Sequence, residues 1–390
     1  MRNNTGYTRL LSRGLAIAAV AGLAWIATRR QTTEPTSMID WNRVETLARR
    51  FARNEEVRIR PDDVANLTAK YSQMVHQSED LITNYTGDRL PSPLTSIHVF
   101  DRDQWLEANI ANFRLLFEPI EDLSRDLVGG AGMGPLLISS VNRLLLSGQL
   151  GVLLGYLSRR VLGQYDLALL GREPITTGRL YFVEPNIHRL ERALRLDGEE
   201  FRLWIALHET THAFEFEAHP WLRDHMNSLL VTYFGTLSKD LAGLRTDVGG
   251  VGGLVRRVGG NVGRTQYTLE LVMSPEQREI FRSLQALMCL LEGYSNHIMD
   301  HVGRSMLRSY STMKARFEER LRRKNLGERL FAKMTGLDVK LEQYVLGERF
   351  VNEVVRQRGI DFMNRVWQSP AYLPTLAEVR APSTWIERVA

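Results

Sequence analysis

The amino-acid sequence predicts a mainly α-helical protein, a large multi-helix domain with at most a small β element. Three observations support this prediction. Apolar residues recur at helical spacing through much of the 390 residues, and Ser, Asp and Pro stand where helices should begin. The clearest strand pattern, aromatic and β-branched residues ended by proline, is confined to residues 178–185. With 44% hydrophobic and 24% charged residues, the chain has the composition of a globular protein with a sizeable core.

The first 39 residues are predicted to be a separate segment. Residues 15–27 form an unbroken apolar run with arginines on both sides, and residues 31–37 form a polar linker that contains proline. The run is shorter than the roughly 20 residues that cross a bilayer. Three interpretations therefore stay open: a retained membrane anchor at residues 14–28, a cleaved signal peptide, and an ordinary buried or unstructured arm. Without an anchor, we expect the protein in the cytoplasm.

Residues 40–390 are predicted to form one helical domain, in which 40–170 and 171–390 are candidate sub-units. Residues 136–162 are apolar enough to suggest a membrane span. Arg143 and several Ser, Asn and Gln side chains make this segment too polar to face lipid, so we expect a pair of buried core helices. Other helical patterns precede it, in residues 40–57, 64–82 and 105–127.

The second candidate sub-unit continues from the predicted strand as helices. Asp197 is expected to cap a helix, with Glu200 three positions on placed to bond back to the cap. Residues 241–265 are dense in glycine and lack apolar periodicity, which predicts a loop that matches no phosphate-binding fingerprint. Ser274, followed by proline, begins a long helix. Further helices are expected in residues 186–196, 306–323 and 326–355.

Charge and cysteine content narrow the kinds of site that the chain can hold. The formal net charge of +5 comes from arginines scattered along amphipathic segments, so we expect no nucleic-acid surface. Cys289 is the only cysteine, which excludes an intramolecular disulfide and a cysteine-based zinc cluster. Any metal ion must therefore be held by histidines and carboxylates.

The motif His208-Glu209-Thr-Thr-His212 carries the chemistry. Two histidines four apart on a helix lie about 40° apart around its axis, so both rings can reach one metal ion. Glu209 projects to the side, where it can act as general base toward a metal-bound water. The pattern arises by chance in about one chain per hundred of this composition. Its place on a predicted helix, behind apolar residues 203–207, favours a genuine site with Zn²⁺ as cofactor.

Zinc needs a third protein ligand, and Glu292 is the best candidate. A carboxylate beside Leu291 is costly to bury unless it is paired or bound to a metal; the alternative is a salt bridge to an inward arginine. Gly293 allows another backbone or a substrate to approach closely. Asn296, one turn on, is a candidate partner for the free N–H of a histidine ligand. Weaker ligand candidates on the same segment are His297, Asp300 and His301.

Other polar residues have secondary candidate roles. His219 stands one residue out of register for the three-histidine spacing of metzincins, and we expect it near the rim of the site. Candidates to stabilise an oxyanion are Tyr294, His297 and His225.

Residues 201–212, 220–225 and 290–293 together resemble a family of zinc-dependent metalloproteases from Actinobacteria and Chloroflexi, often labelled as associated with biosynthesis of a deazaflavin coenzyme. The resemblance extends from about residue 40 to the C-terminus. It implies a zincin-like core in which His208, His212 and Glu292 are ligands and Glu209 is the base. Family members often have Glu-Gly-His-Ala-Asp where this chain has Glu292-Gly-Tyr-Ser-Asn296. The change from Asp to Asn at position 296 removes a negative charge that would support the metal ligands. Further matching segments are 161–166, 359–364 and 367–370.

The expected function is that of a gluzincin-like zinc metallopeptidase with a peptide or protein substrate. Two alternatives are a degenerate zincin scaffold that binds a partner and a zinc hydrolase of a non-peptide substrate. The intact Glu209 disfavours a pure scaffold, because a scaffold needs no general base. The motif itself supports metal-assisted hydrolysis more strongly than it supports any particular bond.

Overall fold

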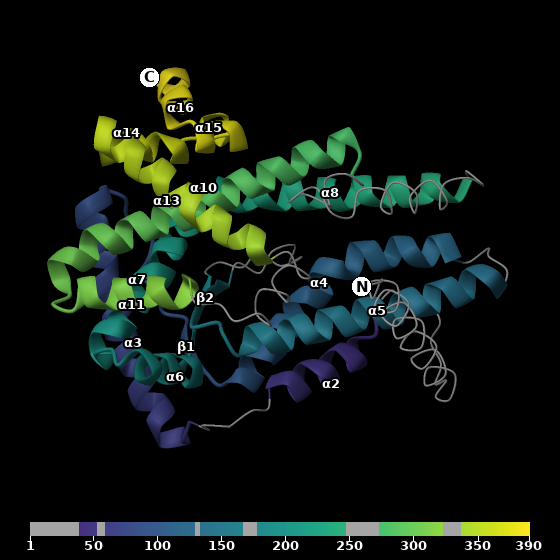
Figure 1. Ribbon diagram of the computed structural model, residues 1–390, viewed down its shortest axis with the longest axis horizontal. Coiled ribbons are helices and arrows are strands. Elements are labelled where there is room, and N and C mark those ends of the chain that lie inside the picture. The colour runs from purple at the N-terminus through teal and green to yellow at the C-terminus, as the bar shows by residue number, and fades with distance from the viewer. Residues whose placement is uncertain (1–38, 53–58, 129–132, 167–177, 247–272, 323–336) are drawn as a thin grey trace, which may run out of the picture.

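The computed structural model describes residues 39–52, 59–128, 133–166, 178–246, 273–322 and 337–390 (Figure 1). Within these ranges the chain is mainly helical with one small sheet, which confirms the predicted fold class. The apolar segment at residues 14–28 lies outside them, so its three interpretations stay predictions. None of the helices in the described ranges is both long and apolar enough to cross a bilayer.

The helices largely follow the apolar patterns of the sequence. The bounds of the longer ones are α2 (Trp41–Ala52), α3 (Pro61–Thr86), α4 (Arg102–Val128), α5 (Met133–Ser158), α6 (Glu184–Leu194), α7 (Gly198–Glu217), α8 (Trp221–Thr246), α10 (Pro275–Met306), α11 (Tyr310–Arg322) and α13 (Leu337–Arg358). At the C-terminus follow α14 (Ile360–Met363), the 3₁₀ turns η1 (Asn364–Trp367) and η2 (Pro370–Tyr372), α15 (Leu376–Arg380) and α16 (Pro382–Val389).

Two predicted boundaries are wrong. Residues 136–162 do not form a pair of buried helices: α5 is one continuous helix, and Leu145 and Leu146 on it are 45% and 40% exposed. The predicted loop at residues 241–265 begins too early, because α8 continues to Thr246; the rest of that loop, from residue 247, lies outside the described ranges. In both places local composition obscured a helix that simply continues.

Three short strands form the sheet: β1 (Ile97–Phe100), β2 (Gly163–Asp166) and β3 (Arg179–Val183), in the order β1-β3-β2. The predicted strand is β3, which runs parallel to β1 and antiparallel to β2. Strands of four residues show too little alternation to be recognised in a sequence, so β1 and β2 were not predicted. Within the described residues, β2 is an edge strand, and it packs against α7.

Apolar side chains gather in two clusters. The larger one surrounds α7 and includes side chains of α3, α10, α13, the sheet and the C-terminal helices. The smaller one joins α2, α4 and α5, which lie side by side in Figure 1, and reaches the sheet at Val183. The larger cluster holds α7 and α10 in place. Helix α7 carries the motif His208–His212, and α10 carries Glu292. The division of the domain at residue 170 stays a prediction.

The N-terminus of α7 corrects the expected capping box. The Asp197 carboxylate accepts hydrogen bonds from the backbone N–H groups of Glu199 and Glu200, at 3.1 and 2.9 Å, as a helix cap should. Glu200 does not bond back to this cap. Its carboxylate accepts hydrogen bonds from the backbone of Arg308 and Ser309, at 3.0 and 2.8 Å, directly before α11. Glu200 therefore satisfies donors at the start of another helix, which local spacing cannot reveal.

Glu378 links α15 to α16 and is expected to make the stability of the fold depend on pH in acid. Its carboxylate accepts hydrogen bonds from Arg388 at 2.6 Å and from the backbone of Thr375 at 2.8 Å. Burial alone would raise the pKa of Glu378, but Arg388 and Thr375 outweigh it and lower that pKa below the usual 4.5. A lowered folded-state pKa stabilises the fold above the unfolded pKa, and this contribution is lost as pH falls through the folded pKa.

We therefore expect Glu378→Gln to make the thermal unfolding midpoint less sensitive to pH below about 4.5, as measured by circular dichroism. The exposed Glu387, on α16, provides the control: Glu387→Gln should leave the acid dependence of the wild type unchanged. An acid dependence in Glu378→Gln equal to that of the wild type would contradict the assignment.

Candidate metal centre

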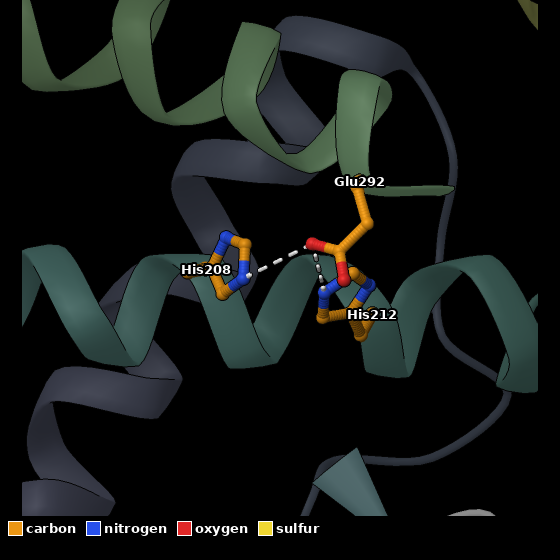
Figure 2. A group of neighbouring side chains, drawn as sticks. All are labelled: His208, His212 and Glu292. Atoms are coloured by element: carbon orange, nitrogen blue, oxygen red, sulfur yellow. Dashed lines mark ion pairs between the residues drawn. The ribbon is translucent and has the colours of Figure 1, made fainter. Parts of the chain in front are cut away.

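Helices α7 and α10 bring the two motif histidines and Glu292 together (Figure 2). The rings of His208 and His212, one helical turn apart on α7, lie edge to face with centroids 4.7 Å apart. Glu292 reaches toward them from α10. One ligand atom from each of the three residues lies within 4.8 Å of the other two. The structure thus brings together the three residues that were predicted from the sequence as metal ligands.

The position of the Glu292 carboxylate suits a cation between the three side chains. Its Oε2 lies 3.9 Å from the Nε2 atoms of both His208 and His212, too far for a hydrogen bond. This buried oxygen has no hydrogen-bond partner in the described part of the chain, an arrangement that is costly unless a cation is bound. Zinc binds such nitrogen and oxygen atoms at about 2.0–2.2 Å, so ligand atoms this far apart can surround one ion.

Two further observations support a metal over a salt bridge at Glu292. Within the described residues its ion-pair neighbours are the two histidines and not the arginine considered as an alternative. The side chains of His208 and His212 remain 19% and 16% exposed, so solvent reaches both histidines. A catalytic zinc site needs such access, because one coordination position must stay open for water or substrate.

Glu215, which was not among the predicted site residues, contacts one of the motif histidines. Its carboxylate, in a side chain buried at the base of the site, lies 2.8 Å from His212 Nδ1. Burial would lower the pKa of His212, but the charge and hydrogen bond of Glu215 outweigh it and raise that pKa to about 9. A carboxylate on the distal nitrogen orients a ligand histidine and increases its basicity. The spacing His212-Ala-Phe-Glu215 places the two on one helix face and was the signal that could have revealed this contact.

Glu209 is buried and lies against the sheet rather than among the ligands. A Cβ atom built on Gly163 of β2 would lie 2.6–2.8 Å from the Cγ, Oε1 and Cδ atoms of Glu209. The carboxylate therefore rests directly on the backbone of the edge strand. This sideways placement agrees with the role of a base that does not ligate.

The candidates for supporting roles on α10 make contacts with other residues. The Tyr294 hydroxyl donates a hydrogen bond to Asn364 at 2.8 Å. The two ring nitrogens of His297 lie 2.7 Å from the Tyr85 hydroxyl and 2.6 Å from Asn352 Oδ1. Asn296 is half-buried. The residue that contacts Nδ1 of His212 is Glu215 and not Asn296. Oxyanion stabilisation by Tyr294 or His297 stays a prediction, which would require these hydrogen bonds to rearrange.

The remaining candidates are also engaged by neighbours. The carboxylate of Asp300 contacts Tyr310 and Lys314. The three remaining candidate histidines pack on aromatic rings: His301 on Tyr85, His219 on Trp367 and His225 beside Trp221. None of these four residues belongs to the group of ligand atoms that the described residues bring together.

Known proteins resemble this chain over most of its length. A family model described as zincin-like metallopeptidase matches residues 39–386. The crystal structure of a protein from Chloroflexus aurantiacus, described as a candidate hydrolase with a novel fold, shares 41% sequence identity and superposes with a TM-score of 0.66. The match covers 90% of this chain and 98% of that one. No curated protein matches the chain. On the extent of the family match, this chain belongs to the zincin-like metallopeptidase family.

Proposed function

We propose that this protein is a zinc-dependent peptidase in which His208, His212 and Glu292 hold the metal ion and Glu209 is the general base. The observation that supports this most directly is the buried Oε2 of Glu292. It lies 3.9 Å from both histidine Nε2 atoms and has no hydrogen-bond partner among the described residues. A bound cation supplies what this oxygen lacks, and a set of two histidines and one glutamate is a known ligand set for catalytic zinc.

The residues around this set divide the chemical work. His208, His212 and Glu292 would hold a zinc ion, which would supply polarisation of a carbonyl group and a lowered pKa of water. Glu209, next to His208 on α7, accepts the proton of the attacking water and passes it to the leaving group. Glu215 holds His212 through Nδ1, so that Nε2 faces Glu292. The backbone of β2 covers Glu209, which keeps bulk water away from that side of the base.

The small sheet favours an extended peptide as substrate. In the described part of the chain, β2 pairs only with β3, and it also carries the glycine that contacts Glu209. An edge strand can add an extended peptide through main-chain hydrogen bonds. A peptide paired in this way would pass its carbonyl groups close to Glu209, which favours a peptide bond over other acyl groups.

Zinc content and cleavage of a peptide library test the proposal together. We expect about one zinc ion per chain and cleavage of a subset of peptides. Glu209→Gln should lower the cleavage rate by roughly 10²–10⁴-fold, because it removes the general base, and should leave the zinc content unchanged. The matched control is Glu199→Gln, on the exposed start of the same helix, which should cleave as the wild type does.

Each alternative function has its own outcome in this experiment. If wild type and Glu209→Gln are equally inert while both hold stoichiometric zinc, the peptidase assignment fails and a non-peptide substrate becomes the better hypothesis. If the purified protein takes up no zinc even when zinc is supplied in excess, the metal assignment fails and a scaffold remains.

A further inference from the structure

We infer that Gly163 is a positioning residue for catalysis: its bare backbone seats the carboxylate of the general base, Glu209. The inference rests on the proposed role of Glu209 and adds a residue that lies outside both the motif and the ligand set. Gly163 contributes no side chain, so its effect must come from the space it leaves free.

The contact between Gly163 and Glu209 leaves no room for a side chain on the strand. A Cβ atom at Gly163 would lie 2.6 Å from Cγ, 2.7 Å from Oε1 and 2.8 Å from Cδ of Glu209. Nonbonded carbon atoms pack at about 3.5–4.0 Å, so any other residue would occupy the space that the carboxylate now fills. The described glycines with positive φ are Gly87 and Gly359, which means that space and not backbone conformation demands glycine at position 163.

The colliding atoms decide what a substitution at Gly163 would disturb. They belong to one side chain, that of Glu209, which can adopt another rotamer, and not to the backbone. At Gly178 and Gly347, by contrast, a Cβ would meet the ring of Tyr165 and a backbone carbonyl, neither of which can move so easily. A methyl group at position 163 should therefore displace the base while the fold persists.

A second contact fixes the strand relative to the helix. Side chains alternate along a strand, so Gly163 and Tyr165 face the same side of β2, toward α7. The Tyr165 hydroxyl donates a hydrogen bond to the carboxylate of Glu217, which also accepts one from Arg223 at 3.1 Å. Glu217 lies eight residues beyond Glu209, about 12 Å along α7. Held at two points, the strand cannot slide, and Gly163 stays under the carboxylate.

The contact with Gly163 matters because a general base works only within hydrogen-bond distance of the group whose proton it takes, about 2.6–3.2 Å. A displacement of about 1 Å can cost on the order of 10²-fold in rate. The strand therefore limits where the carboxylate of Glu209 can lie, on the helix that also carries His208 and His212.

The test compares Gly163→Ala with the wild type in kcat, KM and zinc content. We expect kcat to fall by roughly 10²–10³-fold, with KM and zinc content unchanged. In a Glu209→Gln background, Gly163→Ala should cause no further loss, because the group that it displaces is already inactive. The matched control is Gly148→Ala on α5, where a Cβ would meet no atom within 4 Å.

Crystal structures of zinc-loaded wild type and Gly163→Ala provide a readout that does not depend on activity. We expect the Glu209 carboxylate to leave the strand in the variant. Full activity in Gly163→Ala, or a carboxylate that stays in place while β2 moves, would overturn the inference. If the wild type cleaves no peptide, the proposed function fails, yet the two crystal structures still decide whether Gly163 seats Glu209.

A second variant covers the case in which Gly163→Ala does not fold. Adding Glu209→Ala removes the atoms with which the new methyl group collides. The double variant should then regain the unfolding midpoint of Glu209→Ala alone. A double variant as unstable as Gly163→Ala would show that the defect lies elsewhere in the strand and would overturn the inference.

Discussion

Glu292→Gln is expected to weaken zinc binding by roughly 10²–10³-fold and to remove hydrolytic activity with it. Zinc sites with four protein ligands bind with about 10–16 kcal/mol, or about 2.5–4 kcal/mol per ligand. At about 1.4 kcal/mol per tenfold, the loss of one anionic ligand gives the stated range. Competition with a chromogenic chelator measures the affinity, and a peptide substrate measures the activity.

The metal-free protein provides a second test of Glu292. Its Oε2 is buried without a hydrogen-bond partner in the described residues, so a neutral amide should cost the metal-free fold little or stabilise it. We expect metal-free Glu292→Gln to unfold at or above the temperature of the metal-free wild type. The exposed Glu279, about one turn from the N-terminus of the same helix, is the control, and Glu279→Gln should bind zinc as the wild type does. Zinc affinity in Glu292→Gln equal to the wild-type value would remove Glu292 from the ligand set.

Gly347→Ala is expected to destabilise the fold more than the other single changes considered for this protein. Helices α10 and α13 cross in backbone contact, and a Cβ at Gly347 would lie 1.8 Å from the carbonyl oxygen of Cys289. Gly293, directly after Glu292, faces the same crossing: a Cβ there would lie 2.2 Å from the Gly347 carbonyl carbon. The two helices must separate to admit a methyl group, which costs about 3 kcal/mol or more and outweighs the gain of about 1 kcal/mol in helix propensity.

Urea unfolding followed by circular dichroism measures this effect on the free energy of unfolding. Gly148→Ala, with nothing within 4 Å of the new Cβ, should be neutral or stabilising by up to about 1 kcal/mol. Because the crossing lies beside Glu292, folded Gly347→Ala protein should also bind zinc more weakly. An unfolding curve equal to that of the wild type would show that the helices are not in backbone contact at this point.

The candidate site was predictable where its geometry is local. The spacing of His208 and His212 depends on the helical repeat alone. Glu292 could be nominated because a buried carboxylate needs a counter-charge, and the structure places it opposite the two histidines. Glu215 obeys the same helical spacing, three residues after His212, but a carboxylate at this spacing is common on helices and does not by itself predict a contact with a histidine.

Other parts of the site depend on residues distant in the chain. Gly163 and Glu209 are 46 positions apart, and the residues on either side of each one do not indicate that the two are in contact. Strand β2 exists because it pairs with β3, so its four residues carry little signal of their own. Gly293 was expected to admit another backbone or a substrate. The structure decides for a backbone, that of Gly347.

The amino-acid sequence by itself determined the mainly helical class and the motif on α7, because both follow from periodicities of a few residues along one chain. It also indicated Glu292 as a buried charge in need of a partner. Only the tertiary structure decided which backbone lies under Glu209, which helix Glu200 caps and why Gly293 carries no side chain. Each of these contacts depends on where a segment distant in the chain packs. The space that such a segment fills and the hydrogen-bond donors that it offers cannot be read from the residues next to the contact.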